Sequence, residues 1–99
     1  MTNLLIKEMI QMIKNSFQNI YEQELGVSSL NKNISCPFHE DKKPSMRIAL
    51  SGKYQGRFKC FSCGASGDVI DFVAKNRGIA VHGIEFTTLI KELTTHGGV

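Results

Sequence analysis

The sequence predicts a single α+β domain in which helices flank a small antiparallel β-sheet. A chain of 99 residues has room for one domain only. Both ends show helical spacing of apolar residues, whereas the middle holds both prolines and several glycines. We therefore expect one domain over residues 1–99, with an amphipathic helix over 1–25, a sheet-forming segment over 34–66 and helices over 68–96.

The N-terminal segment predicts one long amphipathic helix. Residues 3–25 contain no Gly or Pro, and Gly26 is a suitable stop. Apolar residues recur every three or four positions, namely Ile6, Ile10, Ile13, Phe17 and Ile20, with Leu5, Met9 and Tyr21 widening the stripe. We favour packing of this stripe on the domain's own core. The alternative is a helix that binds a partner, because so small a domain has little surface with which to cover so long a stripe.

The middle segment predicts an antiparallel hairpin. Residues 45–50 and 54–61 look extended, and Gly56 is suited to a bulge in the second strand. The turn-like residues 51–53 would join the two strands.

The C-terminal segment predicts a tight turn followed by two helices. Small residues at 64–67 permit the turn, and Asp68 then has the chemistry of a helix N-cap. Asp71 falls in the first turn, where its charge favours the helix dipole, and Gly78 ends this helix. A second amphipathic helix is expected over 84–94.

Two short pairs of metal-ligand residues give the strongest signal in the chain. Cys36 and His39 form one pair, Cys60 and Cys63 the other, and the twenty residues 40–59 separate them. Three thiolates and one imidazole at this spacing suit one tetrahedral, four-coordinate Zn²⁺ with a structural role. The alternative is three buried, reduced cysteines and an unrelated histidine. The second strand of the predicted hairpin would end at the second ligand pair.

Composition narrows the classes of function. The apolar stretches at 4–13 and 78–84 are too short to span a membrane, and no secretion signal is visible, so we expect a cytoplasmic protein with no membrane partner. The net charge is +3, yet residues 31–63 hold seven Lys and Arg against two Asp and Glu. A basic centre between slightly acidic ends indicates a site for a polyanion, the alternative being a solvated face.

The residues around the ligands resemble a known family. Cys-Pro-Phe-His at 36–39, Lys-x-Pro-Ser at 42–45 and Phe-x-Cys-Phe-x-Cys-Gly at 58–64 run in order into Ala-Ser-Gly-Asp-Val-Ile at 65–70. This string resembles the zinc-binding domain of bacterial and phage DNA primases of the DnaG type. The resemblance implies a small zinc ribbon on an antiparallel β-sheet flanked by helices, with the zinc ligands at the four positions named above. It also implies that the domain helps to recognise the single-stranded template. Lys42, Pro44, Ser45, Phe58 and Phe61 also match family positions.

The residue chemistry supports the same nucleic-acid role. Basic side chains at Lys42, Lys43, Arg47, Lys53, Arg57 and Lys59 suit phosphates, and the aromatic rings of Tyr54, Phe58 and Phe61 suit stacking on bases. We include Ser45 among the expected nucleic-acid contacts. Alternation along a strand places Phe58 and Lys59 on opposite faces. For each of the aromatic residues, packing in the core is the favoured alternative.

The chain departs from a full primase in three ways. It has no TOPRIM-bearing polymerase domain, Met46 stands where the family usually has an aromatic residue, and the first helix looks longer than the family's. We therefore see no catalytic centre here, and expect a component or fragment of a primase, or a separate small protein of a phage or mobile element.

Three functions fit these observations. The leading one is a primase zinc module that binds single-stranded DNA in primer synthesis, with the polymerase supplied by another chain or domain and a replicative helicase as a further primosome partner. The others are a replication accessory or regulatory DNA-binding protein, and a zinc ribbon that binds another protein.

Overall fold

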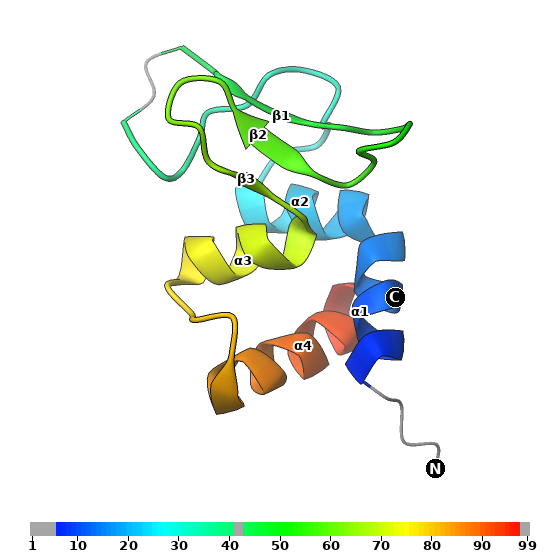
Figure 1. Ribbon diagram of the computed structural model, residues 1–99. Helices are drawn as coiled ribbons and strands as arrows, with labels where there is room; N and C mark the ends of the chain where they lie inside the picture. The colour runs from blue at the N-terminus through cyan, green and yellow to red at the C-terminus, as the bar shows by residue number, and fades with distance from the viewer. Residues whose placement is uncertain (1–5, 41–42, 98–99) are drawn as a thin grey trace.

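The computed structural model describes residues 6–40 and 43–97. Four helices and three strands follow one another as α1 (Ile6–Asn15), α2 (Phe17–Leu25), β1 (Met46–Ile48), β2 (Phe58–Cys60), β3 (Ser66–Gly67), α3 (Val69–Arg77) and α4 (Gly83–Gly97). Figure 1 shows the sheet lying over α2 and α3, with α1 and α4 on the far side of these two helices. This arrangement confirms the predicted α+β class, with helices packed beside a small antiparallel sheet.

The sheet has the order β1-β2-β3, and both pairs are antiparallel. The hairpin of β1 and β2 confirms the sequence prediction, with Arg47 opposite Lys59. Its strands are shorter than expected, because residues 54–56 form a turn rather than strand. In this turn Arg57 N–H donates to the Tyr54 carbonyl over 2.9 Å, and Gly56 N–H donates to the Ala49 carbonyl over 2.7 Å.

The third strand corrects the expectation of a simple turn at 64–67. Ser66 pairs with Lys59, and Gly67 pairs with Phe58. The turn instead lies between the strands, where Gly64 N–H donates to the Cys60 carbonyl over 2.9 Å. Gly67 is required by space, since a Cβ there would lie 2.8 Å from the Cβ and the carboxylate of Asp71. Short strands built from Gly and Ser carry no alternating hydrophobic pattern, so periodicity does not reveal them.

The expected N-terminal helix is divided in two at Ser16. Ser16 has φ −104° and ψ 22°, outside the helical region, and its side chain makes no cap hydrogen bond. Figure 1 shows the chain changing direction there, so that α1 lies along α4 while α2 lies under the sheet. One straight helix cannot make both contacts. The first five residues of the expected helix lie outside the described part of the chain.

The apolar stripe nevertheless packs mainly on the domain's own core, as favoured. Ile13, Phe17, Ile20 and Tyr21 are buried, whereas Ile6 at the start of α1 is 43% exposed. Gly26 ends α2 with φ 68°, and its N–H donates to the Glu22 carbonyl.

The capping of α3 agrees with the sequence. Asp68 accepts a hydrogen bond from the Asp71 amide over 2.8 Å, and the Asp71 carboxylate accepts one from the Asp68 amide over 3.1 Å. This reciprocal capping box fixes the start of the helix, and Gly78 with φ 71° ends it. The last helix runs from Gly83 to Gly97 and so extends beyond the predicted 84–94.

A single hydrophobic core joins the sheet to all four helices. At its centre the Tyr21 and Phe58 rings lie 5.1 and 5.2 Å from that of Phe72. The Tyr21 hydroxyl donates to the Gly56 carbonyl over 2.8 Å, which ties α2 to the hairpin. In the ranges that the structure describes, no helix has both the length and the apolar character needed to cross a bilayer.

A network of charged groups links three helices. Arg77 of α3 donates to both carboxylate oxygens of Glu24 in α2, over 3.1 and 2.9 Å, and to Glu92 of α4 over 3.1 Å. Asn76 adds a further hydrogen bond to Glu24 over 3.1 Å. Burial alone would raise the pKa of Glu24, but the hydrogen bonds from Arg77 and Asn76 outweigh it and lower that pKa.

Candidate metal centre and nucleic-acid surface

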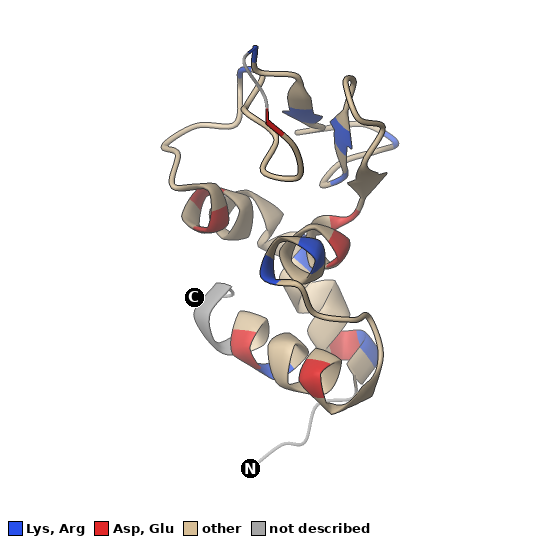
Figure 2. Ribbon diagram, turned by 90° about the vertical axis from the view of Figure 1, so that its left-hand side faces the viewer, with Lys and Arg blue, Asp and Glu red and all other residues tan. Residues whose placement is uncertain are grey.

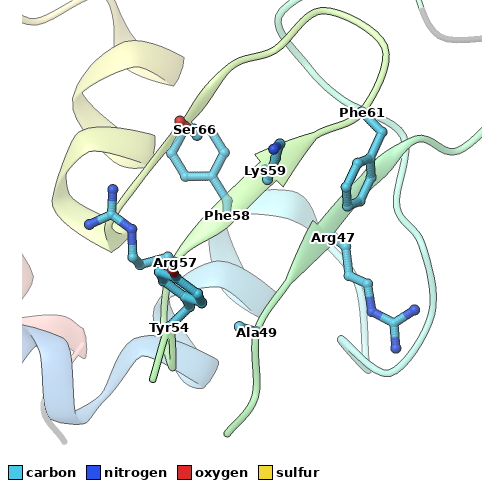
Figure 3. Close-up of a pocket in the computed structure, with 8 residues that line it drawn as sticks. All are labelled: Arg47, Ala49, Tyr54, Arg57, Phe58, Lys59, Phe61 and Ser66. Atoms are coloured by element: carbon cyan, nitrogen blue, oxygen red, sulfur yellow. The ribbon is translucent and has the colours of Figure 1, made fainter. Parts of the chain in front are cut away.

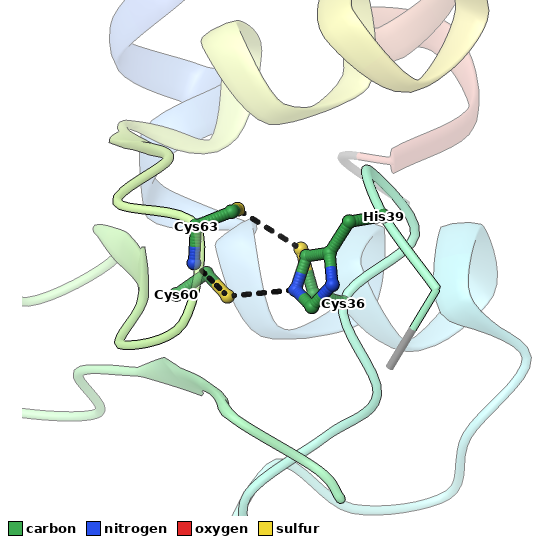
Figure 4. A group of neighbouring side chains, drawn as sticks. All are labelled: Cys36, His39, Cys60 and Cys63. Carbon is green, nitrogen blue, oxygen red and sulfur yellow. Dashed lines mark hydrogen bonds between the residues drawn. The ribbon is translucent and has the colours of Figure 1, made fainter. Parts of the chain in front are cut away.

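Backbone pairing brings the two ligand pairs together. Ile34 and Met46 exchange two hydrogen bonds of 2.8 and 3.0 Å, which places the segment with Cys36 and His39 beside the sheet. Cys60 is the last residue of β2, and Cys63 lies in the turn that follows. Figure 4 shows the four side chains converging from these two segments.

The distances among the four side chains fit one tetrahedral ion. Their ligand atoms all lie within 4.8 Å of one another. Cys36 Sγ and Cys63 Sγ are 3.9 Å apart, and His39 Nε2 lies 3.2 Å from Cys60 Sγ. Zinc bond lengths of about 2.3 Å to sulfur and about 2.0 Å to nitrogen imply separations of roughly 3.5 to 3.8 Å at tetrahedral angles. The set therefore matches one Zn²⁺ held by four protein ligands.

The orientation of His39 identifies its metal-binding nitrogen. Nδ1 lies 2.8 Å from the Glu40 carbonyl oxygen, which can only accept a hydrogen bond. Nδ1 must therefore carry the proton, and the lone pair of Nε2 faces the thiol cluster. Such a backbone partner fixes both the tautomer and the direction of a histidine ligand.

Neighbouring hydrogen-bond donors stabilise the thiolate form of Cys60. Burial would raise the pKa of Cys60, but hydrogen bonds that include those from the Ser45 hydroxyl and the Cys63 amide outweigh burial and lower it to about 5. The Ser45 Oγ lies 3.3 Å from the sulfur, and the Cys63 nitrogen lies 3.4 Å from it. Cys36 differs, because burial and the neighbouring thiols of Cys60 and Cys63 raise its pKa to about 12.

A bound Zn²⁺ supplies the positive charge that stabilises all three thiolates together. With four protein ligands the site has no position left for water or substrate, which is the mark of a structural ion. Its effect is to join the loop before β1 to the turn after β2.

The outer face of the sheet gathers most of the predicted nucleic-acid residues. Figure 3 shows a hollow there, lined by Arg47, Ala49, Tyr54, Arg57, Phe58, Lys59, Phe61 and Ser66. Tyr54 is 61% exposed and Phe61 is 67% exposed, so core packing, the favoured alternative, is wrong for both rings. Lys53 lies 5.7 Å from the centre of the Tyr54 ring, and Lys59 lies 5.7 Å from that of Phe61.

Phe58 and the predicted contact residues outside the hollow are placed differently. Phe58 is only 2% exposed and packs in the core, so its ring is not presented to a base. Ser45 contacts the sulfur of Cys60. Lys43 and Lys53 are exposed but do not line the hollow. Lys42 lies outside the described residues.

The two layers of the molecule differ in charge. Figure 2 shows mainly Lys and Arg at the sheet end, whereas the helices carry charged residues of both signs. The sequence indicated this difference, but it did not show that Arg47, Arg57 and Lys59 share one hollow.

Two features of the site have no signal in the sequence. One is the Glu40 carbonyl that orients His39, since every residue carries such a group. The other is the contribution of Ala49 and Ser66 to the sheet-face hollow, which depends on strand pairing.

Comparison with known proteins gives a consistent answer. The CHC2 zinc finger family matches residues 5–99. The chain is 31% identical over 81 residues to a DNA primase of Clostridium acetobutylicum, and 32% identical over 88 residues to one of Lactococcus lactis. It is also 43% identical over 58 residues to a DNA primase of Mycoplasma genitalium.

The matches cover most of this chain but a small part of each relative. They include 78% of the chain for the Clostridium protein, 87% for the Lactococcus protein and 54% for the Mycoplasma protein. The corresponding shares of the relatives are 13%, 13% and 9%. The chain thus spans about one eighth of the length of the Clostridium and Lactococcus primases.

Proposed function

This chain belongs to the CHC2 zinc finger family of DnaG-type primases, and from that premise we propose that it binds the single-stranded DNA template during primer synthesis. The outer face of the sheet would be the binding surface, and polymerase activity would be supplied by another chain or domain. A replicative helicase would be a further partner of this chain. The chain would act in the cytoplasm.

One observation carries the proposal: exposed aromatic rings and exposed cations share one face of a rigid sheet. Arg47 and Lys59 lie opposite each other on β1 and β2, with both side chains exposed. Cations beside stacking surfaces are how proteins hold single strands without reading every base. The zinc ribbon below keeps this face in shape, because β2 ends at a zinc ligand.

A salt titration tests the proposed surface. The double variant R47Q/K59Q removes two exposed charges and keeps the buried residues on either side of each along its strand. Each lost phosphate contact lowers the slope of log affinity against log salt by about 0.7, so the slope for a single-stranded oligonucleotide should fall by about 1.4.

The matched control is K7Q, which removes one exposed charge from the helical layer. Its slope should equal that of the wild type. Equal losses per removed charge in both variants would show a general effect of net charge, and an unchanged slope in R47Q/K59Q would place the DNA elsewhere.

Stacking gives a second prediction for the same surface. The F61A variant should bind single strands about 1 to 3 kcal/mol more weakly, because a base loses its aromatic partner. Since Phe61 is 67% exposed, its thermal unfolding midpoint should stay unchanged. Fluorescence anisotropy with a labelled oligonucleotide measures the affinity, and undiminished binding by F61A would rule out stacking on this ring.

A priming assay separates a primase module from an accessory DNA-binding protein. Primer yield and start sites would be compared for a primase polymerase domain alone, for this chain alone and for the mixture. Tethering a weak template binder to the polymerase raises the local template concentration, so the mixture should show more primers or altered start sites. A mixture identical to the polymerase alone would favour the accessory role, and primer synthesis by this chain alone would overturn the proposed division of labour.

A protein-binding role remains the second candidate because some large apolar side chains are exposed on the helical layer. Ile84 is 84% exposed, Val81 54% and Ile6 43%. A DNA affinity that is negligible at low salt would favour this role over template binding.

A further inference from the structure

A second hollow lies beside the sheet face, between the hairpin turn, the end of α1 and the start of α3. Lys14, Gln55, Arg57 and Asp68 form its polar walls. Its base is apolar, since it is lined by Phe17 and Val69, which are 6% and 1% exposed. None of the four metal-ligand residues lines this hollow.

The two hollows share a lining residue, because Arg57 lines both of them. Figure 3 shows Arg57 at the edge of the sheet face that is nearer α3, with Lys59 and Arg47 progressively further from it. A strand that follows these three cations towards α3 therefore reaches Arg57 at the entrance of the second hollow.

Lys14 supplies the next cation beyond Arg57. Its Nζ lies 3.8 Å from an oxygen of Asp68, and the two side chains are 47% and 26% exposed. Exposed pairs of this kind contribute little free energy, so the ammonium group is easily exchanged onto a phosphate. The other oxygen of Asp68 accepts the Asp71 amide at the start of α3, which holds the carboxylate in place.

We propose that a single DNA strand on the sheet face continues past Arg57 into the second hollow, where Lys14 contacts one of its backbone phosphates. This inference rests on the proposed function, and it extends the DNA footprint from the sheet onto the helical layer. Lys14 would attract the phosphate, and the neighbouring Asp68 carboxylate would repel it.

The test compares short and long oligothymidylates, because only a strand longer than the sheet face reaches Lys14. Lengths of about 4 and about 12 nucleotides bracket the footprint of a small single-strand binding domain. In the K14Q variant the salt slope for the long strand should fall by about 0.7, whereas the short strand should bind as it does to the wild type. K7Q, an exposed lysine on the same helix, is the matched control and should change neither strand.

The D68N variant gives a prediction of opposite sign. Asn caps a helix about as well as Asp, so α3 should keep its start while the opposing charge is lost. The long strand should bind more tightly to D68N than to the wild type, with a smaller change for the short strand. Circular dichroism and thermal unfolding confirm that each variant folds.

The outcomes separate this inference from the proposed function. If R47Q/K59Q weakens binding of both strands and K14Q weakens binding of the long strand only, the proposed function and the second-hollow inference are both supported. If R47Q/K59Q weakens binding and K14Q does not, the strand does not enter the second hollow, and the sheet-face proposal stands. If the wild type binds neither strand, both are overturned. Equal effects of K14Q and K7Q also overturn the second hollow, since net charge alone then explains them.

Discussion

At the residue scale, single polar groups connect the site to the fold. The Glu40 carbonyl sets the tautomer of His39, and the Ser45 hydroxyl supports the thiolate of Cys60. Away from the metal, the Tyr21 hydroxyl reaches the Gly56 carbonyl at the turn that presents Tyr54 and Arg57. The position of the proposed DNA-binding face thus depends on a hydrogen bond from beneath it.

The Y21F variant measures that hydrogen bond. Tyr21 is fully buried, and loss of its hydroxyl leaves the buried Gly56 carbonyl without this hydrogen-bond donor. The free energy of unfolding should fall by about 1 to 3 kcal/mol in a denaturant titration. Y54F is the matched control, because the exposed Tyr54 should lose its hydroxyl at no cost. Equal stability of the two variants would mean that Gly56 finds another donor.

At the element scale, three helices are held together by one charged network. Arg77 bridges α2 and α4 from α3 through Glu24 and Glu92. This network lies on the side chains of residues 24, 77 and 92, which are far apart in the chain and meet only because the helices pack.

Glu24 gives stability a defined pH dependence. Burial raises its pKa, but the hydrogen bonds from Arg77 and Asn76 lower it further than burial raises it. A carboxyl group whose pKa is lowered by folding stabilises the fold above its unfolded pKa of about 4.3, and that stabilisation disappears as the pH falls through the folded pKa.

The E24Q variant should therefore be less stable than the wild type by about 1 kcal/mol at neutral pH, the partial exposure of the network keeping the value small. The difference should shrink as the pH falls below about 4.3. Denaturant titrations at several pH values measure it, with the exposed E85Q as control. A difference between E24Q and the wild type that does not vary with pH would show that the charge of Glu24 is not the cause.

At the scale of the whole molecule, the zinc ribbon and the helices share one core. Phe58 of β2 packs on Phe72 of α3, and Cys60 is buried two residues further along the same strand. A small domain buries limited apolar area, and a metal that binds only the folded state adds its binding free energy to folding. Loss of zinc is therefore expected to affect the whole domain.

The C63S variant tests this dependence. Cys63 is exposed, so its replacement removes a zinc ligand without opening a cavity in the core, as a change at Cys60 would. We expect one zinc per wild-type chain by elemental analysis, and loss of cooperative thermal unfolding both in C63S and after chelation. S62A, an exposed neighbour in the same turn, should retain zinc and stability. A zinc-free C63S as stable as the wild type would contradict the structural role.

Local chemistry explains why so much was predictable from the sequence. The spacing of the two ligand pairs predicts the metal site. Asp68 and Gly78 predict the two ends of a helix through their capping preferences. The alternation of Phe58 and Lys59 along a strand predicts which side chain is buried and which is exposed. Each of these signals depends on a few neighbouring residues, so it can be recognised in the sequence without knowledge of the fold.

The remaining features arise only when distant segments meet. Ser16 interrupts the first helix because α1 must pack along α4 while α2 supports the sheet. Ser66 and Gly67 become a strand because β2 offers them an edge. The rings of Phe38, Phe58 and Phe72 pack on one another in the folded domain, whereas those of Tyr54 and Phe61 are exposed. By itself the sequence determined the metal ligands, the helix ends and the basic centre of the chain. The tertiary structure decided which cations and rings share a surface, because that depends on packing between residues far apart in the chain.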